Sequence, residues 1–176
     1  MGRRLIEVHM RHGQRHGDSM SQLGIHEFLA MLHLLATRLL YEKYLEEILV
    51  YSSTMGRVLE MRGLLKSVLT HWKIQMSPAT KWLNEARGLS TLPAHMPACP
   101  SYGNGIIPFW RDTPAHDLPR EIESWDEVTQ RCTTAMDTIE KGHEEQFQPT
   151  DEEQLCVFLY HGGVIEPMLH SRYGFQ

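Results

Sequence analysis

The chain has 176 residues, which is the size of one ordinary domain. Hydrophobic residues make up 41% of it and charged residues 22%, values that allow a buried core and are typical of globular proteins. The formal net charge of −5 argues against a general nucleic-acid-binding protein, which would carry a basic excess.

The cysteines and the first residues indicate a compartment. Cys99, Cys132 and Cys156 have neither the number of a disulfide scaffold nor the spacing of a CxxC zinc site, so we expect a reducing environment, the cytoplasm. The opening MGRRLIEVHM lacks the apolar segment and cleavage site of a signal peptide. No apolar run approaches the roughly 20 residues of a membrane helix, and we expect no membrane partner.

The first half of the chain alternates predicted strands with predicted helices. Three short apolar runs are typical of buried strands: residues 5–10, 47–53 and 72–78. Apolar side chains in residues 21–40 recur at the helical spacing i, i+3, i+4 and i+7. A second helix follows the second strand, and the hydroxyl residues that end this strand, Ser52 and Ser53, are expected to cap the helix.

The amino-acid composition changes at the start of the second half. Residues 78–123 hold most of the nine prolines and predict an irregular excursion with at most short helices, a lid or binding loop. Residues 124–147 predict a helix that opens with a capping box of Ser124 and Glu127. Residues 153–161 form the strongest predicted strand, followed by a turn and a short helix.

This order of elements predicts the fold class. Strands that alternate with helices indicate an α/β three-layer sandwich, with a mainly parallel central sheet and helices on both faces. We find no internal repeat and no linker, so we expect a single domain over 1–176, with the excursion at about 78–123 as an insert.

Cationic and imidazole side chains follow three of the predicted strands. The first strand ends at Arg11, His12 and Gly13, the second leads to Arg57, and the last ends at His161. Ligands of parallel sheets bind at the carboxyl ends of the strands, so these groups are expected to converge. Each of them alone is typical of an ordinary turn or helix. Their joint occurrence predicts a site for a phosphate or a carboxylate.

Four segments carry a resemblance to a known family. LIEVHMRHGQ, SQLGIHEF, VYSSTMGRVLEM and CVFLYHGGVI resemble the successive motifs of the histidine phosphatase (phosphoglycerate-mutase-like) superfamily, in the branch whose second histidine lies in a His-Gly motif. The resemblance implies a metal-independent phosphomonoester hydrolase that works through a phosphohistidine and needs no cofactor. It implies a phosphorylated small molecule or a phosphoprotein as substrate, and it leaves the identity of that substrate open.

The resemblance also implies roles for individual residues. His12 would be the nucleophile, and Arg11, Arg57 and His161 would surround the phosphoryl oxygens. The general acid would be Glu85 in WLNEARG, with reserves in the same excursion at Asp112, Asp117 and Glu121. Three further residues are expected to contact the substrate: Gly13, Arg15 and Gly162.

Departures from the family pattern keep other functions open. The family often carries Asn where this chain has Asp18, which would repel phosphate unless a cation such as Arg15 paired with it. A phosphoglycerate-type mutase and a weak, phospholigand-binding or protein-binding pseudo-phosphatase remain alternatives. A metal site at the nearby histidines is disfavoured because no Cys or carboxylate completes a ligand set. The aromatic and basic side chains of the excursion form either a pocket wall or a small core: Trp82, Phe109, Trp110 and Arg111.

Overall fold

The computed structural model describes four ranges, residues 5–41, 47–100, 105–146 and 154–174. Their contacts divide the chain into two compact units. The first comprises Met1–Asn84 and Lys141–His161, and the second comprises Glu85–Glu140 and Gly162–Gln176.

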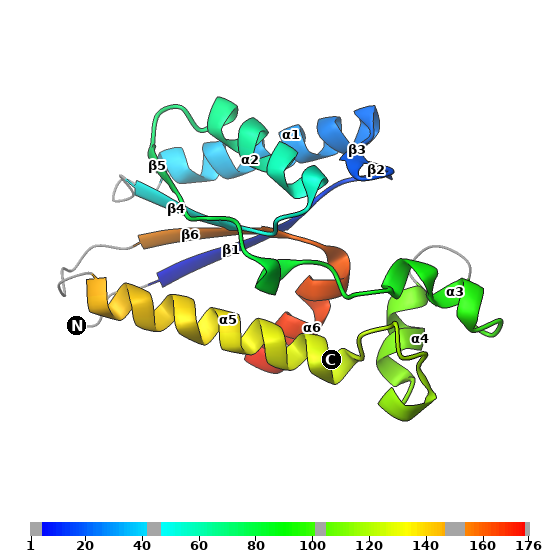
Figure 1. Ribbon diagram of the computed structural model, residues 1–176. Coiled ribbons are helices and arrows are strands. Elements are labelled where there is room, and N and C mark those ends of the chain that lie inside the picture. The colour runs from blue at the N-terminus through cyan, green and yellow to red at the C-terminus, as the bar shows by residue number, and fades with distance from the viewer. Residues whose placement is uncertain (1–4, 42–46, 101–104, 147–153, 175–176) are drawn as a thin grey trace. The chain divides into compact units, whose positions relative to one another are not determined.

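A four-stranded parallel sheet forms the centre of the first unit (Figure 1). Its strands stand in the order β1 (Leu5–Arg11), β6 (Gln154–Tyr160), β4 (Glu47–Ser52) and β5 (Lys73–Met76). The last strand of the chain thus lies between the first and the second long strands. The register sets Arg11 opposite Tyr160 and Ser52 opposite Leu159. The residues that follow these three strands therefore meet at one edge of the sheet, as predicted.

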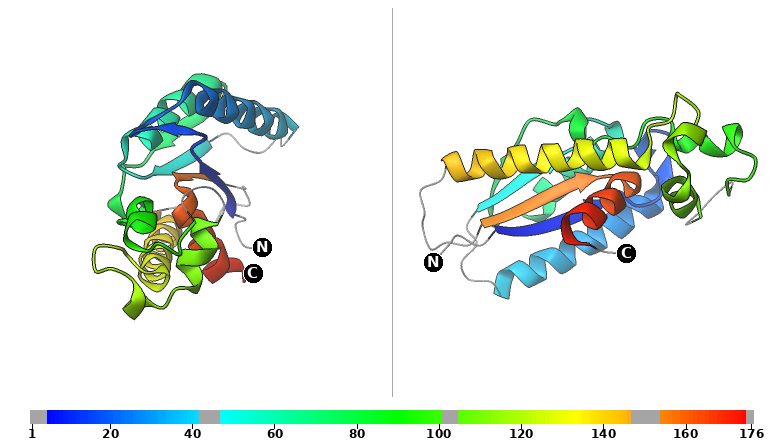
Figure 2. Two further views of the ribbon diagram at one scale, coloured as in Figure 1. Left: turned by 90° about the vertical axis from the view of Figure 1, so that its right-hand side faces the viewer. Right: turned by 90° about the horizontal axis from the view of Figure 1, so that it is seen from below.

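Two helices cover one face of this sheet, α1 (Gln22–Tyr41) and α2 (Gly56–Val68) (Figures 1 and 2). Every second residue of the strands points into a core with them. That core includes Met10, Ile48, Val50, Leu155, Val157 and Leu159 of the sheet, and Phe28, Leu32, Leu39, Val58, Met61 and Leu65 of the helices. The sheet and its flanking helices confirm the predicted fold class.

The composition of α1 corrects the expectation that no apolar segment approaches the length of a membrane helix. Its 19 residues Gln22–Leu40 have a mean hydropathy of 1.3, so the segment is long and apolar enough to cross a membrane by these measures alone. The sequence reasoning had found no such run, because it looked for uninterrupted apolar residues. In the structure, Phe28 and Leu32 of this helix are buried in the core of the first unit.

The opposite face of the sheet carries a stack of rings. His9 and Tyr51 flank Phe158, with ring centroids 5.2 and 5.3 Å from it. The Nδ1 of His9 is hydrogen-bonded to the hydroxyl of Tyr160, and its Nε2 lies 3.2 Å from a carboxylate oxygen of Glu7. Burial raises the pKa of Tyr51 to about 12, with Cys156 as a second cause. Both ring nitrogens of His9 therefore have partners on this face of the sheet.

A small hairpin, which the sequence analysis did not anticipate, connects β1 to α1. It consists of β2 (Arg15–His16) and β3 (Ser19–Met20). Gly17 in its turn has a φ of 62°, a left-handed conformation that glycine adopts without strain. Met20 is buried in the core, and its N–H donates to a carboxylate oxygen of Glu60 at 2.9 Å. The hairpin is thereby anchored to α2 and presents Asp18 from its turn.

The second unit consists of short elements and parts of two longer helices. The short ones are η2 (Leu89–Thr91), α3 (Leu92–His95), α4 (Ile106–Asp112) and η3 (Ala115–Asp117). Their lengths agree with the expectation of at most short helices, and the role of the excursion as a lid or insert stays a prediction. The longer ones are α5 (Trp125–Gln146), of which residues up to 140 belong here, and α6 (Gly162–Tyr173). No turn precedes α6, which begins immediately after His161.

The structure tests the predicted capping box at Ser124 and the predicted environment of the tryptophans. Ser124 and Glu127 form the predicted capping box, with the Ser124 N–H donating to the carboxylate at 2.7 Å. Trp110 is fully buried and packs edge to face on Trp125, so it belongs to a core. Trp82, in η1 (Lys81–Leu83) of the first unit, is 52% exposed, so the core interpretation is wrong for it.

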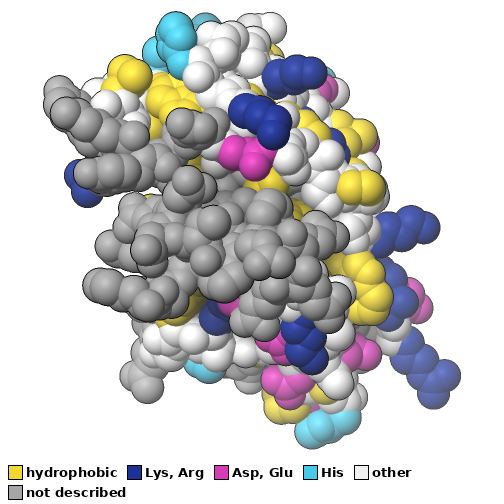
Figure 3. All heavy atoms as spheres, turned by 90° about the vertical axis from the view of Figure 1, so that its left-hand side faces the viewer, with side chains coloured by type: hydrophobic (Ala, Val, Ile, Leu, Met, Phe, Trp, Pro, Cys, Tyr) yellow, Lys and Arg dark blue, Asp and Glu magenta, His cyan; other side chains and the backbone are white. Residues whose placement is uncertain are grey.

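On the face shown in Figure 3, the coloured side chains of different kinds are interspersed. Lys and Arg lie beside Asp, Glu and hydrophobic side chains over the described residues. This mixture agrees with the modest net charge of −5.

Candidate active site

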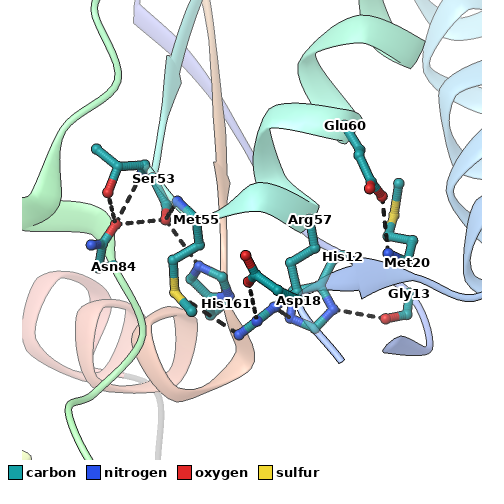
Figure 4. A network of polar contacts seen from close by, with 11 residues as sticks. His12, Gly13, Asp18, Met20, Ser53, Met55, Arg57, Glu60, Asn84 and His161 are labelled. Atoms are coloured by element: carbon teal, nitrogen blue, oxygen red, sulfur yellow. Dashed lines mark hydrogen bonds and ion pairs between the residues drawn. The ribbon is translucent and has the colours of Figure 1, made fainter. Parts of the chain in front are cut away.

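His12 stands directly after β1 in a fixed orientation (Figure 4). Its Nδ1 lies 2.7 Å from the carbonyl oxygen of Gly13. A carbonyl can only accept, so Nδ1 carries the proton. Its Nε2 accepts a hydrogen bond from Nε–H of Arg57 at 3.0 Å. The imidazole is therefore neutral, and the lone pair of Nε2 points toward a guanidinium.

Arg57 supplies a buried positive charge. It is the second residue of α2 and only 2% of it is exposed. Its Nη1 lies 3.4 Å from Oδ1 of Asp18, and its Nη2 lies 4.0 Å from the sulfur of Met55. The pairing of Asp18 with Arg15 that the sequence analysis considered is not found among the described residues, because the hairpin turn directs the carboxylate to Arg57 instead. A Cβ on Gly56 would come within 2.7 Å of that carboxylate, so Asp18 lies against the first turn of α2.

His161 follows β6 and is completely buried. Its ring is inclined at 64° to that of His12, with the centroids 5.2 Å apart. Its Nε2 lies 3.0 Å from Oγ of Ser53, whereas its Nδ1 has no hydrogen-bond partner among the described residues. Burial, and next the electrostatic influence of Arg57, His12 and Arg15, lowers the pKa of His161 to about 2. This imidazole is therefore neutral as well.

Ser53 and Asn84 form a polar cluster beside His161 (Figure 4). Oδ1 of Asn84 accepts from Oγ of Ser53 at 2.7 Å, from the N–H of Thr54 at 2.9 Å and from its hydroxyl at 3.0 Å. The N–H of Met55 donates to Ser53 at 3.1 Å. The expectation that Ser53 caps α2 is wrong, because Met55 is the N-cap residue and no side chain caps the helix.

Sequence reasoning did not single out Asn84. The segment WLNEARG contains it, but its neighbour Glu85 was chosen there. The signal lies in the pairing of backbones: Ser53 and Thr80 form a parallel bridge beyond the ends of their strands. That bridge extends the sheet and brings residue 84 alongside Ser53. A single sequence does not reveal it.

The backbone that carries His12 is held by α1. Ser21 accepts the N–H of Gly24 at 3.1 Å and thus caps the helix, while its own N–H donates to the carbonyl of Gln14 at 2.9 Å. Glu27 accepts the N–H of Gln14 at 3.1 Å. A Cβ on Gly13 would lie 2.6 Å from the carbonyl oxygen of Gly24, so the loop and the helix approach as closely as two glycines permit.

The remaining predicted site residues lie as follows. Arg11 ends β1 and is exposed, and within the described ranges no hydrogen bond or ion pair holds its side chain. Arg15 is exposed in the hairpin, and its charge acts on His161. Gly162 begins α6. Glu85 follows Asn84 directly and belongs to the second unit, where its Cγ is 3.9 Å from the place of a Cβ on Gly163. The roles assigned to these residues stay predictions.

The structure thus brings together His12, Arg57 and His161, with Asp18, Ser53 and Asn84 around them. A neutral imidazole is a nucleophile through the lone pair of its unprotonated nitrogen, and a buried guanidinium binds an anion. The start of α2 adds backbone N–H groups and the positive end of a helix dipole. In the described part of the chain, no group of three or more His, Cys, Asp or Glu side chains could hold a metal ion.

Comparison of the fold with solved structures gives consistent results, whereas the sequence matches no protein-family model and no curated protein. A mycobacterial glucosyl-3-phosphoglycerate phosphatase is 20% identical with a TM-score of 0.67, over 96% of this chain and 79% of that one. A phosphoglycerate mutase from Bacillus anthracis is 17% identical with a TM-score of 0.63, over 96% and 80%. A putative alpha-ribazole-5'-P phosphatase from Escherichia coli is 17% identical with a TM-score of 0.56, over 100% and 82%. The chain therefore has the phosphoglycerate-mutase-like α/β fold of these structures.

Proposed function

We propose that the protein is a metal-independent phosphomonoester hydrolase that forms a phosphohistidine at Nε2 of His12. One observation carries this proposal. Nδ1 of His12 donates to Gly13, and Nε2 accepts from the buried guanidinium of Arg57 at 3.0 Å. A phosphoryl group bound by Arg57 would therefore meet the lone pair of Nε2, so the cation that holds the substrate also faces the nucleophile.

The first half of the reaction transfers the phosphoryl group to the protein. The lone pair of Nε2 attacks phosphorus, the bond from phosphorus to the leaving oxygen breaks, and that oxygen takes a proton from a carboxylic acid. Arg57 stabilises the charge that spreads over the equatorial oxygens, and Arg11 and His161 are assigned the same task. The Gly13 carbonyl holds the Nδ1 proton and stabilises the positive ring that forms.

The second half returns the protein to its resting state. The carboxylate that gave up its proton removes one from water, the water oxygen attacks phosphorus, and the bond to Nε2 breaks. Inorganic phosphate and neutral His12 result. We assign the acid to Glu85, because it is adjacent in sequence to Asn84 and packs by Gly163, two residues beyond His161.

We assign a phosphorylated small molecule or a phosphoprotein as the substrate class. The printed names of similar structures, a glucosyl-3-phosphoglycerate phosphatase and an alpha-ribazole-5'-P phosphatase, support a small phosphate ester. A second candidate function is supported by the contact of Asp18 with Arg57. A carboxylate that already occupies the anion-binding guanidinium would weaken catalysis, and the protein would then act mainly as a binder of phosphorylated ligands.

Hydrolysis of p-nitrophenyl phosphate in the presence of EDTA tests the proposal. Wild type is compared with His12→Ala and with a matched control, His26→Ala, whose side chain is exposed on α1. We expect activity in the wild type and the control and none in His12→Ala. A phosphoryl group trapped on the wild type should be labile to acid and stable to base, as phosphohistidine is.

Other outcomes have definite meanings. Activity that survives in His12→Ala, or that disappears with EDTA, contradicts the proposal. Binding of phosphate without hydrolysis by the wild type supports the second candidate. Transfer of the trapped group to a phosphoglycerate in preference to water would make the protein a mutase.

A further inference from the structure

The hydrogen bonds beside His161 determine which of its nitrogens carries the proton. The starting point is Asn84, whose amide oxygen and nitrogen are distinguished by their partners. The backbone N–H of Thr54 can only donate, and it lies 2.9 Å from the atom assigned as Oδ1. That atom must therefore be the acceptor, the oxygen.

The orientation of the Ser53 hydroxyl follows from this assignment. Oγ of Ser53 lies 2.7 Å from Oδ1 of Asn84, and an amide oxygen cannot donate. The single hydroxyl proton of Ser53 is therefore used in this bond. Toward its other two partners Ser53 can only accept, and the N–H of Met55 is one of them.

The second donor to Ser53 is His161. Because Oγ has no further proton to give, Nε2 of His161 at 3.0 Å must carry the hydrogen. In the neutral ring the other nitrogen, Nδ1, then has a bare lone pair. That Nδ1 belongs to a completely buried residue and has no hydrogen-bond partner among the described residues. A buried polar atom of this kind is costly unless a ligand satisfies it.

An unprotonated phosphoryl oxygen cannot satisfy a bare lone pair, since both are acceptors. It can accept a hydrogen bond from Nδ1 only if that atom is protonated. We propose that Asn84, acting through Ser53, is a positioning residue that holds His161 as the Nε2–H tautomer, and that the phosphoryl group binds together with one proton taken up at Nδ1. This inference rests on the proposed function, because it concerns the same anion-binding site.

The charges around His161 explain why the proton arrives only with the anion. The groups that act on it are Arg57 of α2, His12 after β1 and Arg15 of the hairpin, and each disfavours a further positive charge. Asp18 faces Arg57 and offsets part of its charge. A bound dianion offsets these cations and adds a negative charge beside Nδ1, so the protonated ring becomes favourable.

Binding of sulfate tests the inference without turnover. Sulfate remains a dianion over the range of interest, so a proton taken up on binding comes to the protein. Calorimetry in two buffers of different ionisation enthalpy counts these protons at about pH 8, above the ordinary histidine pKa of about 6.5. The His12→Ala background removes the other imidazole. We expect a net uptake of protons on sulfate binding, and an affinity that falls as the pH rises.

Variants of Asn84 separate the tautomer from mere structure. In Asn84→Ala the Ser53 hydroxyl is free to donate to Nε2, which favours the Nδ1–H tautomer, so sulfate should bind with almost no proton uptake. Asn84→Asp keeps an acceptor for Ser53 and should restore the uptake. Nitrogen-15 NMR of the His161 ring reports the same change directly, as an exchange of the protonated and bare nitrogens.

The outcomes of these experiments distinguish a failure of the inference from a failure of the proposed function. A wild-type ring protonated on Nδ1, or sulfate binding without proton uptake in the His12→Ala background, overturns the inference and leaves the proposed function intact. Absence of sulfate binding in the wild type overturns the anion site, and with it the proposed function. If Asn84→Ala does not fold, Ser53→Ala removes the same relay, and unchanged proton uptake in it contradicts the inference.

Discussion

Asp18→Asn removes a negative charge from the guanidinium that the proposed mechanism uses. Asp18 lies 3.4 Å from Nη1 of Arg57, and its side chain is 71% exposed. Asparagine fits a tight turn as well as aspartate does, so the hairpin is expected to keep its shape. The variant should therefore change the affinity for an anion rather than the fold.

Two effects contribute to the expected gain in affinity. An exposed ion pair contributes about 0.2 to 1 kcal/mol, and burial of Arg57 to 98% favours the upper end of that range. A dianion on the same guanidinium would lie about 6 Å from the carboxylate, where repulsion in water amounts to roughly 1.4 kcal/mol. Together these effects give about 2 kcal/mol, or roughly a thirtyfold lower Kd for phosphate, and less at high salt.

Calorimetric titration with inorganic phosphate measures this effect. The matched control is Glu47→Gln, which removes the same charge at the opposite end of β4 and should leave the Kd unchanged. An affinity gain in both variants would indicate a general effect of net charge. No gain in Asp18→Asn, or weaker binding, would refute the reasoning that Asp18 competes with the phosphoryl group.

Three further outcomes are expected. The folded pKa of His161, about 2, lies below its ordinary value of 6.5, so only the unfolded chain binds this proton as the pH falls below 6.5. The free energy of unfolding of the wild type, measured in urea, should thus fall by about 1.4 kcal/mol for each pH unit below 6.5 because of this group. In His161→Gln this contribution to the pH dependence should be absent. Glu85→Gln should slow hydrolysis of an alkyl phosphate far more than that of an aryl phosphate, whose phenol leaves without a proton; equal losses would remove Glu85 as the acid. Gly24→Ala would place Cβ 2.1 Å from the carbonyl oxygen of Gln14, so the phosphatase activity should fall severely. The control Gly63→Ala, at an open position of α2, should keep its activity. Equal activities of the two variants would mean that the loop after His12 tolerates displacement.

The sequence predicted the parts of the fold that local patterns encode. Hydrophobic periodicity located α1, and the capping box located the start of α5. The convergence of His12, Arg57 and His161 followed from a general rule about parallel sheets, because all three come directly after strands or at a helix start. These features depend on neighbours in sequence, which a single chain displays.

The features that were missed depend on pairing between distant segments. Asp18 meets Arg57 because a hairpin of two-residue strands folds over the start of α2, and strands of that length give no periodic signal. Asn84 meets Ser53 because the backbones pair beyond the end of the sheet. Ser53 was assigned to the nearest helix, as is usual for a hydroxyl before a helix, although its partner His161 is far along the chain.

The strand order also has a consequence for synthesis and folding. β6 is the last strand made, yet it separates β1 from β4 in the sheet. Until it emerges from the ribosome, β1 lacks β6, its hydrogen-bonding neighbour in the described sheet, and its unpaired edge favours aggregation. The strand that completes the sheet ends immediately before His161. Completion of the fold and completion of the site are therefore one late event, and a chain interrupted before β6 could acquire neither.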